Sequence, residues 1–301
     1  MRIVSLVPHA TELLFALGLD DEVVGVTHEC DYPLEALDRT RVTRDVLQPP
    51  GATPLTAGEI DAAVRERTEQ GEAIYALDEE VLAALEPDLI VTQALCPVCA
   101  VSVDDVRAVA AKLPEPPKVI ALDPTTIGET MGDVRTIAQA TGAKEAAVAL
   151  VARQRSRIDR VKIAVKDAER VPVAAIEWLD PVFIGGHWVP QMIELAGGID
   201  VLGFPGERSE TTTWDMVAAA EPEVVVLMPC GYDEDRTLDE ALLFADQLRA
   251  VGARRTVAVN GSAYFSRPGP RLIDGLELLA HILHPELVRD APGAVLDVPL
   301  F

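Results

Sequence analysis

Short apolar runs rich in β-forming residues alternate with amphipathic helical stretches through nearly all of the 301 residues. The run and the helical stretch that follows it are RIVSLV with ATELLFALG, DLIVTQ with VDDVRAVAAKL, VPVAAIEW with WVPQMIELAGG, and EVVVLMP with TLDEALLFADQLRAV. Parallel strands need long crossover connections, which are usually helices, and those helices bury both faces of the sheet. The alternation therefore predicts an α/β fold built on parallel sheets.

One segment interrupts this pattern. Residues 144–170 contain no Gly or Pro, and the apolar residues Ala147, Leu150, Val151, Ile158 and Val161 fall on one helical stripe. A helix of this length spans roughly 40 Å, which is more than one small lobe needs. We therefore predict an N-terminal lobe over residues 1–142, a connecting helix over 143–170 and a C-terminal lobe over 171–301. The alternative is one more surface helix on a single large α/β domain.

Composition excludes several classes of function. The formal net charge of −23 disfavours binding to phosphate backbones, so we expect no nucleic-acid partner. No apolar run reaches the length of a transmembrane helix, so we expect no membrane insertion. Met1 and Arg2 lead directly into IVSLVP without a signal-peptide pattern. We expect a cytoplasmic protein as written, or a periplasmic or extracellular one if a leader was removed.

Polar, aromatic and thiol residues gather directly after the predicted strands. Open parallel sheets bind ligands beyond the carboxyl ends of their strands. If the carboxyl edges of two lobes face each other, these residues line one cleft. The ligand-binding candidates are His28, Glu29, Cys30, Tyr32, Cys96, Cys99, His187, Trp188, Trp214, Tyr232, Tyr264, Phe265 and Arg267.

The stretch Cys96-Pro97-Val98-Cys99 admits several interpretations. It can form the wall of a cleft, or it can be a redox pair at the start of the helix predicted from Val103. A metal site of Cys30, Cys96, Cys99 and Cys230 requires distant thiols to meet. Buried, unreactive thiols are the fourth interpretation.

No catalytic motif was found. The chain contains no GxSxG, no phosphate-binding lysine loop and no GxGxxG. This absence favours a binding protein over an enzyme, and no cofactor is required.

Five stretches together resemble cobalamin-binding proteins of the vitamin B12 transport receptor type, within the helical-backbone (class III) substrate-binding proteins. They are RIVSLVPHATELLFALGLDDEVVGVTHECDYP, LEPDLIVTQALCPVCAVS, FIGGHWVPQMIELAGGIDVLG, TTWDMVAAAEPEVVVLMPCGY and SAYFSRPGPRLIDGLELLAHILHP. The resemblance implies two α/β lobes joined by one long helix, a small-molecule ligand held between them, and an ABC transporter permease and ATPase as partner.

On this resemblance, the leading hypothesis is a binding protein for cobalamin or a related corrinoid. Aromatic side chains would supply stacking surface, namely Tyr32, Trp188, Trp214, Tyr232 and Tyr264. His28, His187 and Arg267 would bind peripheral amide or phosphate groups. The second hypothesis is a binder of a metal ion or metal chelate, such as zinc, iron, haem or a siderophore, through Cys and His. The third is a thiol-dependent redox enzyme that uses Cys96 and Cys99.

Overall fold

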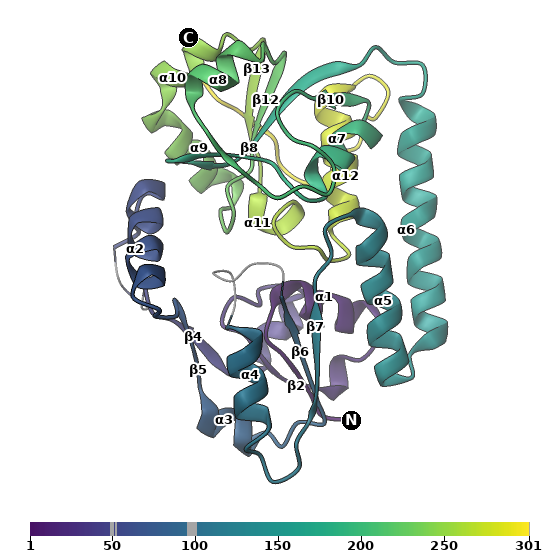
Figure 1. The fold of residues 1–301 in the computed structure, drawn as a ribbon. Coiled ribbons are helices and arrows are strands. Elements are labelled where there is room, and N and C mark those ends of the chain that lie inside the picture. Colours follow the sequence, from purple (N-terminus) through teal and green to yellow (C-terminus); the bar gives the residue numbers. More distant parts are fainter. Residues whose placement is uncertain (49–50, 52, 95–100, 301) are drawn as a thin grey trace. The chain divides into compact units, whose positions relative to one another are not determined.

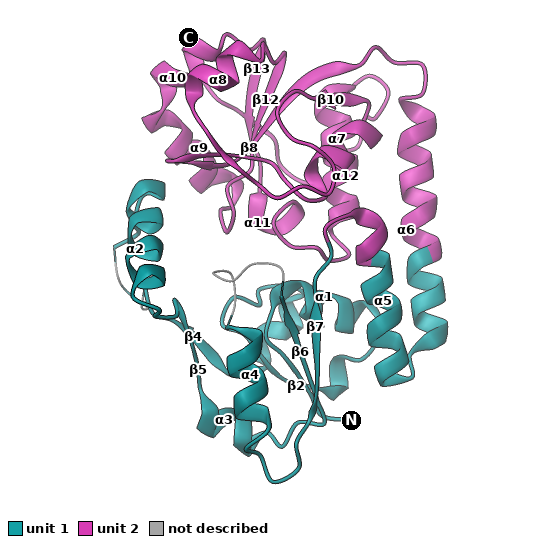
Figure 2. Cartoon of the chain, in the orientation of Figure 1, with its two compact units in different colours: residues 1–124, 131–151 teal, residues 125–130, 152–301 magenta. Residues whose placement is uncertain are grey.

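The computed structural model describes residues 1–48, 51, 53–94 and 101–300 and divides into two compact units (Figure 2). Unit 1 comprises residues 1–124 and 131–151, and unit 2 comprises residues 125–130 and 152–301. Each unit contains its own sheet with helices packed on it, so the predicted two-lobe α/β class is confirmed.

Unit 1 is built on a five-stranded sheet in which every pairing is parallel. In spatial order the strands are β3 (Thr40–Arg41), β2 (Val23–Val26), β1 (Ile3–Ser5), β6 (Leu89–Gln93) and β7 (Lys118–Leu122). A separate antiparallel pair consists of β4 (Thr43–Asp45) and β5 (Tyr75–Leu77). The carboxyl ends of the five parallel strands share one edge, which is where the predicted ligand residues His28, Glu29, Cys30 and Tyr32 follow β2.

The helices of unit 1 begin where side chains can cap them. Thr56 and Glu59 form a capping box at the start of α2, and Asp78 accepts a hydrogen bond from the backbone N–H of Val81 in α3. The helical segments are α1 (Pro8–Ala16), η1 (Asp20–Glu22), η2 (Leu34–Asp38), α2 (Ala57–Glu69), α3 (Glu79–Ala84), α4 (Val103–Ala110) and α5 (Ile127–Thr141), whose first turn belongs to unit 2. Val4, Ile90, Leu82 of α3 and Val106 of α4 form a buried core on one face of the sheet.

Unit 2 is built on a seven-stranded mixed sheet (Figure 1). Its strands are β8 (Val171–Leu179), β9 (Val182–Ile184), β10 (Gly198–Asp200), β11 (Thr211–Thr212), β12 (Val224–Leu227), β13 (Arg255–Ala258) and β14 (Leu296–Asp297). The central strands β10, β8, β12 and β13 are parallel, whereas β9 turns back antiparallel on β8 and β14 lies antiparallel to β13. The sheet is thus parallel in its centre and antiparallel toward both margins.

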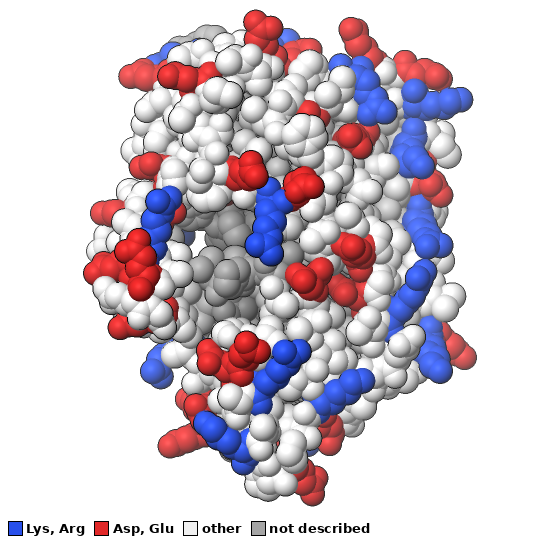
Figure 3. All heavy atoms as spheres, in the orientation of Figure 1, with Lys and Arg blue, Asp and Glu red and all other residues white. Residues whose placement is uncertain are grey.

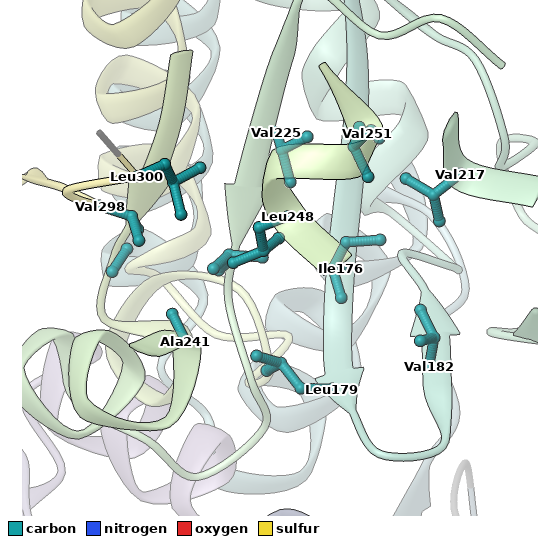
Figure 4. Close-up of a cluster of buried hydrophobic side chains, with 13 residues drawn as sticks. Ile176, Leu179, Val182, Val217, Val225, Ala241, Leu248, Val251, Val298 and Leu300 are labelled. Carbon is teal, nitrogen blue, oxygen red and sulfur yellow. The ribbon is translucent and has the colours of Figure 1, made fainter. Parts of the chain in front are cut away.

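Helices cover both faces of the unit 2 sheet. They are α7 (Val189–Leu195), α8 (Trp214–Ala219), α9 (Glu234–Leu243), α10 (Ala245–Val251), α11 (Gly261–Tyr264) and α12 (Leu272–Leu283). Side chains of α8, α9 and α10 pack with Ile176 and Val225 in the cluster of Figure 4. On the other face, Ile193 of α7, Leu283 of α12 and Val173 crowd around Gly198. Burial of apolar side chains on both faces explains why the strands are continuous apolar runs.

The long helix α6 runs over Lys144–Ala164 and crosses from unit 1 to unit 2 at residues 151–152. It ends six residues before the predicted end at Arg170, because the chain turns after Ala164 and enters β8 at Val171. Ala147, Leu150, Val151 and Val161 of the predicted stripe are buried. No helix in the described residues is both long and apolar enough to span a membrane.

The structure also differs from the predicted strand–helix alternation directly after VAAIEW, where no further strand was predicted. It contains β9, so Gly185, Gly186 and His187 follow a strand that runs antiparallel to β8. The turn at Asp180 and Pro181 links the two strands too tightly to be recognised from alternation alone. Likewise, TLDEALLFADQLRAV is divided at Phe244 into α9 and α10, where Phe244 packs against the hydrophobic cluster.

Candidate ligand-binding site

A hydroxyl and imidazole cluster lies at the carboxyl end of β2 in unit 1. Thr43 Oγ1 lies 2.7 Å from His28 Nδ1 and 2.8 Å from Thr27 Oγ1, and it accepts a hydrogen bond from the His28 backbone N–H at 3.0 Å. Arg41 Nη1 donates to the Thr27 carbonyl at 2.8 Å. Thr43 belongs to β4, so the small antiparallel pair fixes the orientation of the His28 ring.

Burial lowers the pKa of His28 below its usual value of 6.5, with Arg41 adding to the shift and Asp45 opposing it. The imidazole is therefore neutral at pH 7. Its ring lies 5.1 Å from the Tyr75 ring, centroid to centroid. Because Nδ1 is engaged by Thr43, the Nε2 atom is the ring nitrogen that a ligand can use.

The neighbouring candidates are held by the same layer of side chains. Tyr75 donates from its hydroxyl to Glu29 Oε1 at 2.9 Å. Cys30 is 1% exposed, and its Sγ lies 3.0 Å from the hydroxyl of Thr11 in α1. Tyr32, at 46% exposure, is the predicted aromatic of this lobe that offers open surface.

In unit 2, the central feature is the carboxylate of Glu177. This residue occupies an irregularity in the pairing of β8 with β9, between Ile176 and Trp178. Its Oε1 accepts a hydrogen bond from the Gly186 backbone N–H at 3.3 Å, and its Oε2 accepts one from the Ser209 hydroxyl. Burial raises the pKa of Glu177 to about 7, and the nearby Asp200 also raises it.

The turn Gly185-Gly186-His187 is locked against the loop of residues 203–210. His187 donates its backbone N–H to the Glu207 carbonyl at 2.5 Å and accepts from the Gly206 N–H at 2.8 Å. A Cβ on Gly186 would stand 2.2 Å from the Ser209 backbone nitrogen, so only glycine fits there. His187 itself has a φ of +54° and is partly exposed, and its ring lies 5.4 Å from the Trp188 ring, centroid to centroid.

The indole of Trp188 is buried inside unit 2 and joins two segments of that unit. Its Nε1 donates to the Phe265 carbonyl at 2.7 Å, and the side chain is 4% exposed. Phe265 is 1% exposed. Both residues were predicted to contact ligand through their side chains, but the structure packs them inside unit 2, where they hold α7 against the segment that follows α11.

The remaining aromatic candidates also have internal contacts. Tyr232 is 2% exposed, lies edge-on to Trp178 at 5.4 Å and is covered by the guanidinium of Arg236 at 3.7 Å. Trp214 stacks at 6.1 Å on Phe244 in the hydrophobic cluster. The stacking surface expected of these two rings is therefore largely taken up by the fold.

Tyr264 packs on the C-terminal segment. Its hydroxyl donates to the Pro292 carbonyl at 3.2 Å, and its ring occupies the space that a Cβ on Gly293 would need. A sequence separation of 28 residues hides this contact from sequence reasoning, and the stacking role of the ring stays a prediction. Arg267 is partly exposed in the next loop, and its role stays a prediction.

The four cysteines do not form a site that the structure describes. Cys30 is buried in unit 1, and Cys230 is exposed in unit 2. Cys96 and Cys99 lie outside the described residues. Among the residues that are described, no group of three or more His, Cys, Asp or Glu could hold a metal ion. The four-thiol metal site therefore stays a prediction.

Three residues near the carboxyl edges of the two sheets were not predicted from the sequence. Thr43 and Glu177 act through contacts made only in the folded chain. Phe204 had a local signal, because Pro205 and Gly206 with a φ of +84° form the pattern of a type II turn, which the Glu207 N–H closes onto the Phe204 carbonyl at 3.2 Å. This turn presents a phenyl ring that is 72% exposed.

Two α/β units with polar groups at the carboxyl edges of their sheets are typical of a substrate-binding protein. Residues 3–256 match the periplasmic binding protein family, and the chain belongs to this family of non-enzymatic substrate-binding proteins. The prediction that the protein is not an enzyme is therefore confirmed.

Curated relatives match over most of the chain. The vitamin B12-binding protein of Vibrio cholerae is 23% identical over 285 residues, covering 92% of this chain and 86% of the relative. The cobalamin-binding protein of Halobacterium salinarum is 24% identical over 290 residues, covering 94% and 69% respectively.

Solved structures share the fold. The periplasmic vitamin B12-binding protein BtuF of Vibrio cholerae aligns with a TM-score of 0.64 at 20% identity, over 94% of this chain and 96% of that one. The periplasmic haem-binding protein HutB of the same organism aligns with a TM-score of 0.66 at 17% identity, over 95% and 99%. The scaffold is therefore shared by proteins with different ligands.

Proposed function

We propose that this protein binds cobalamin or a related corrinoid and delivers it to an ABC transporter. The observation that carries the proposal is the similarity to two cobalamin-binding relatives over more than nine tenths of the chain. The family's description supports a periplasmic or extracellular location among the predicted compartments.

The chemistry of the two edges agrees with such a ligand. A corrinoid presents a large apolar ring with neutral amides at its margin. The described edges offer neutral or partly neutral groups, because burial removes the proton of His28 and favours protonation of Glu177. Exposed Tyr32 and Phe204 offer apolar surface, while His187 offers an imidazole for hydrogen bonding.

Calorimetry with cyanocobalamin tests this proposal. We expect saturable binding at one site per chain, weakened severalfold by His187→Ala. The control His281→Ala in α12, whose Nδ1 lies 2.8 Å from the Val288 carbonyl, should leave binding unaffected. If the wild-type protein gives no heat with tens of micromolar ligand, the corrinoid proposal is wrong.

One observation favours a second candidate, haem or another iron chelate. A neutral imidazole whose Nδ1 is fixed by a hydroxyl is a suitable metal ligand through Nε2, and His28 has this arrangement. Titration with haemin would give a Soret shift that His28→Ala abolishes. Binding of haemin with no binding of cyanocobalamin would replace the first proposal with the second.

A further inference from the structure

Arg41 lies at the carboxyl end of β3 in unit 1, next to the segment that carries His28. Its backbone pairs with Val26 of β2, so it is level with the end of that strand. Its Nη1 donates to the Thr27 carbonyl at 2.8 Å, and the side chain is partly buried. The fold therefore holds a guanidinium at a fixed place on this edge of the sheet.

Arg41 shares a side of the chain with Thr43. In an extended segment alternate side chains point the same way, and Val42 between these two packs in the hydrophobic core of unit 1. Arg41 and Thr43 both reach the segment of His28 instead. Burial lowers the pKa of His28 most, and the charge of Arg41 lowers it as well, so the guanidinium is close to the imidazole.

The carboxylates around His28 do not pair with this guanidinium. Within the described part of the chain, Arg41 has no ion pair and makes a single side-chain hydrogen bond. Asp45 Oδ1 accepts from the two backbone N–H groups at residues 47 and 48, at 2.7 and 3.1 Å, and Glu29 Oε1 accepts from the Tyr75 hydroxyl at 2.9 Å. A guanidinium carries several N–H donors, so Arg41 keeps donors for a further acceptor.

A local cation matters in this chain because its total charge repels anions. The chain has 49 Asp and Glu against 26 Lys and Arg, and Figure 3 shows acidic side chains among the basic ones on the visible face. At physiological ionic strength the Debye length is about 8 Å, so an anionic group that comes close responds to Arg41 more than to distant carboxylates. The planar guanidinium matches the oxygen pairs of phosphate and carboxylate groups.

We propose that Arg41 binds an anionic oxygen group, a phosphate or a carboxylate, at the margin of the ligand. This inference rests on the proposed function and specifies how the ligand is oriented, because a corrinoid with a phosphodiester would carry that group toward unit 1. A carboxylate of an iron chelate would use the same donors. The contact is charge-assisted at a partly buried side chain, so it is stronger than an exposed ion pair.

NMR of the arginine Nε–H groups tests the anion site in the full chain without a corrinoid. During titration with inorganic phosphate at constant ionic strength, the signal that is missing in Arg41→Gln should shift saturably. The signal that is missing in Arg44→Gln should stay in place, since Arg44 is an exposed arginine on the same segment. The proposal fails if phosphate leaves the Arg41 signal unmoved or shifts both signals equally.

Calorimetry then compares cyanocobalamin with dicyanocobinamide, a corrinoid that lacks the phosphodiester. Arg41→Gln should weaken binding of cyanocobalamin about tenfold and binding of dicyanocobinamide less than about twofold, because only the first loses a charge-assisted contact. The matched control Arg44→Gln should leave both affinities unchanged. If Arg41→Gln does not fold, Arg41→Lys takes its place, because lysine keeps the charge but loses the planar donor geometry and should still weaken cyanocobalamin selectively.

The two assays separate this inference from the proposed function. Equal affinity of wild type and Arg41→Gln for cyanocobalamin overturns the inference and leaves the corrinoid function standing. A phosphate-dependent shift of the Arg41 signal without binding of either corrinoid rejects the corrinoid function and supports the anion site. In that case, weaker binding of haemin by Arg41→Gln identifies ligand carboxylates as the source of the anion.

Discussion

Each of the two sheets has a carboxyl edge organised by its own kind of contact. In unit 1, threonine hydroxyls fix an imidazole, and the segment that carries it follows a parallel strand directly. In unit 2, a single carboxylate ties a glycine turn to a distant loop after an antiparallel strand. In both units burial moves the pKa of the central group toward its uncharged form. The comparison teaches that a chain of net charge −23 still keeps these two positions close to neutral.

The largest expected effect comes from breaking the glycine turn of unit 2. Gly186→Ala places a Cβ against the Ser209 backbone, and backbone cannot yield as a flexible side chain can. We expect a loss of more than about 3 kcal/mol in the free energy of unfolding, measured by denaturant titration. In contrast, Gly132→Ala in α5 meets nothing within 4 Å and should stabilise the protein by about 0.5–1 kcal/mol. If the two variants had similar free energies of unfolding, the close approach of Gly186 to the Ser209 backbone would be contradicted.

The next effect is a pH dependence that belongs to Glu177. Its pKa is raised from 4.5 in the unfolded chain to about 7 in the fold, so the folded state binds more protons between these values. Stability from this group is therefore present below pH 4.5 and lost as pH rises to 7, by up to about 3 kcal/mol. Glu177→Gln should remove that slope, whereas Glu210→Gln at an exposed position should keep it. Parallel profiles for wild type and Glu177→Gln would show that the carboxylate is not desolvated.

The contact between α6 and α12 should contribute less. Arg157→Ala leaves Asp274 and Glu277 without their guanidinium, and the three side chains are 28%, 27% and 21% exposed. We expect a cost of about 1–2 kcal/mol that shrinks in high salt. Arg107→Ala, whose partner Asp104 is 93% exposed, should cost at most about 0.5 kcal/mol. Thermal unfolding at two salt concentrations compares them, and equal losses would refute a special role for Arg157.

The smallest expected effect is on the pKa of His28 in unit 1. His28 should titrate below 6.5 in NMR spectra, because desolvation disfavours the imidazolium. Tyr75→Ala opens one side of the ring and should move the pKa of His28 back up. The stability that the neutral ring contributes is present above 6.5 and is lost as pH falls through the lowered pKa. An imidazole that titrates at or above 6.5 in the wild type would exclude the buried neutral form.

Much of the architecture could be predicted from periodicity. The alternating runs identified the parallel strands β1, β6, β8 and β12, because each is a continuous apolar segment. The Gly- and Pro-free segment located α6 but not its end. Strands β9, β11 and β14 were not predicted, because they are short and pair antiparallel, outside the alternation of parallel strand and helix.

The candidate site was predictable in outline and not in detail. Position after a strand singled out His28 and His187, which neighbouring elements hold in place in the fold, and their contact with a ligand stays a prediction. It could not separate Tyr32, which is exposed, from Tyr232 and Phe265, which are buried. A residue's side chain can turn toward the core or toward solvent with the same local sequence, and only packing with distant segments decides which.

By itself the sequence determined the class of fold, the family and the surplus of negative charge, because these depend on composition and on patterns repeated along the chain. The tertiary structure decided which groups lose their charge and which rings remain open. The side chains that contact His28 and Glu177 come from 15 and 32 positions away in the sequence, namely Thr43 and Ser209. Such encounters follow from how the strands pair, which no local pattern records.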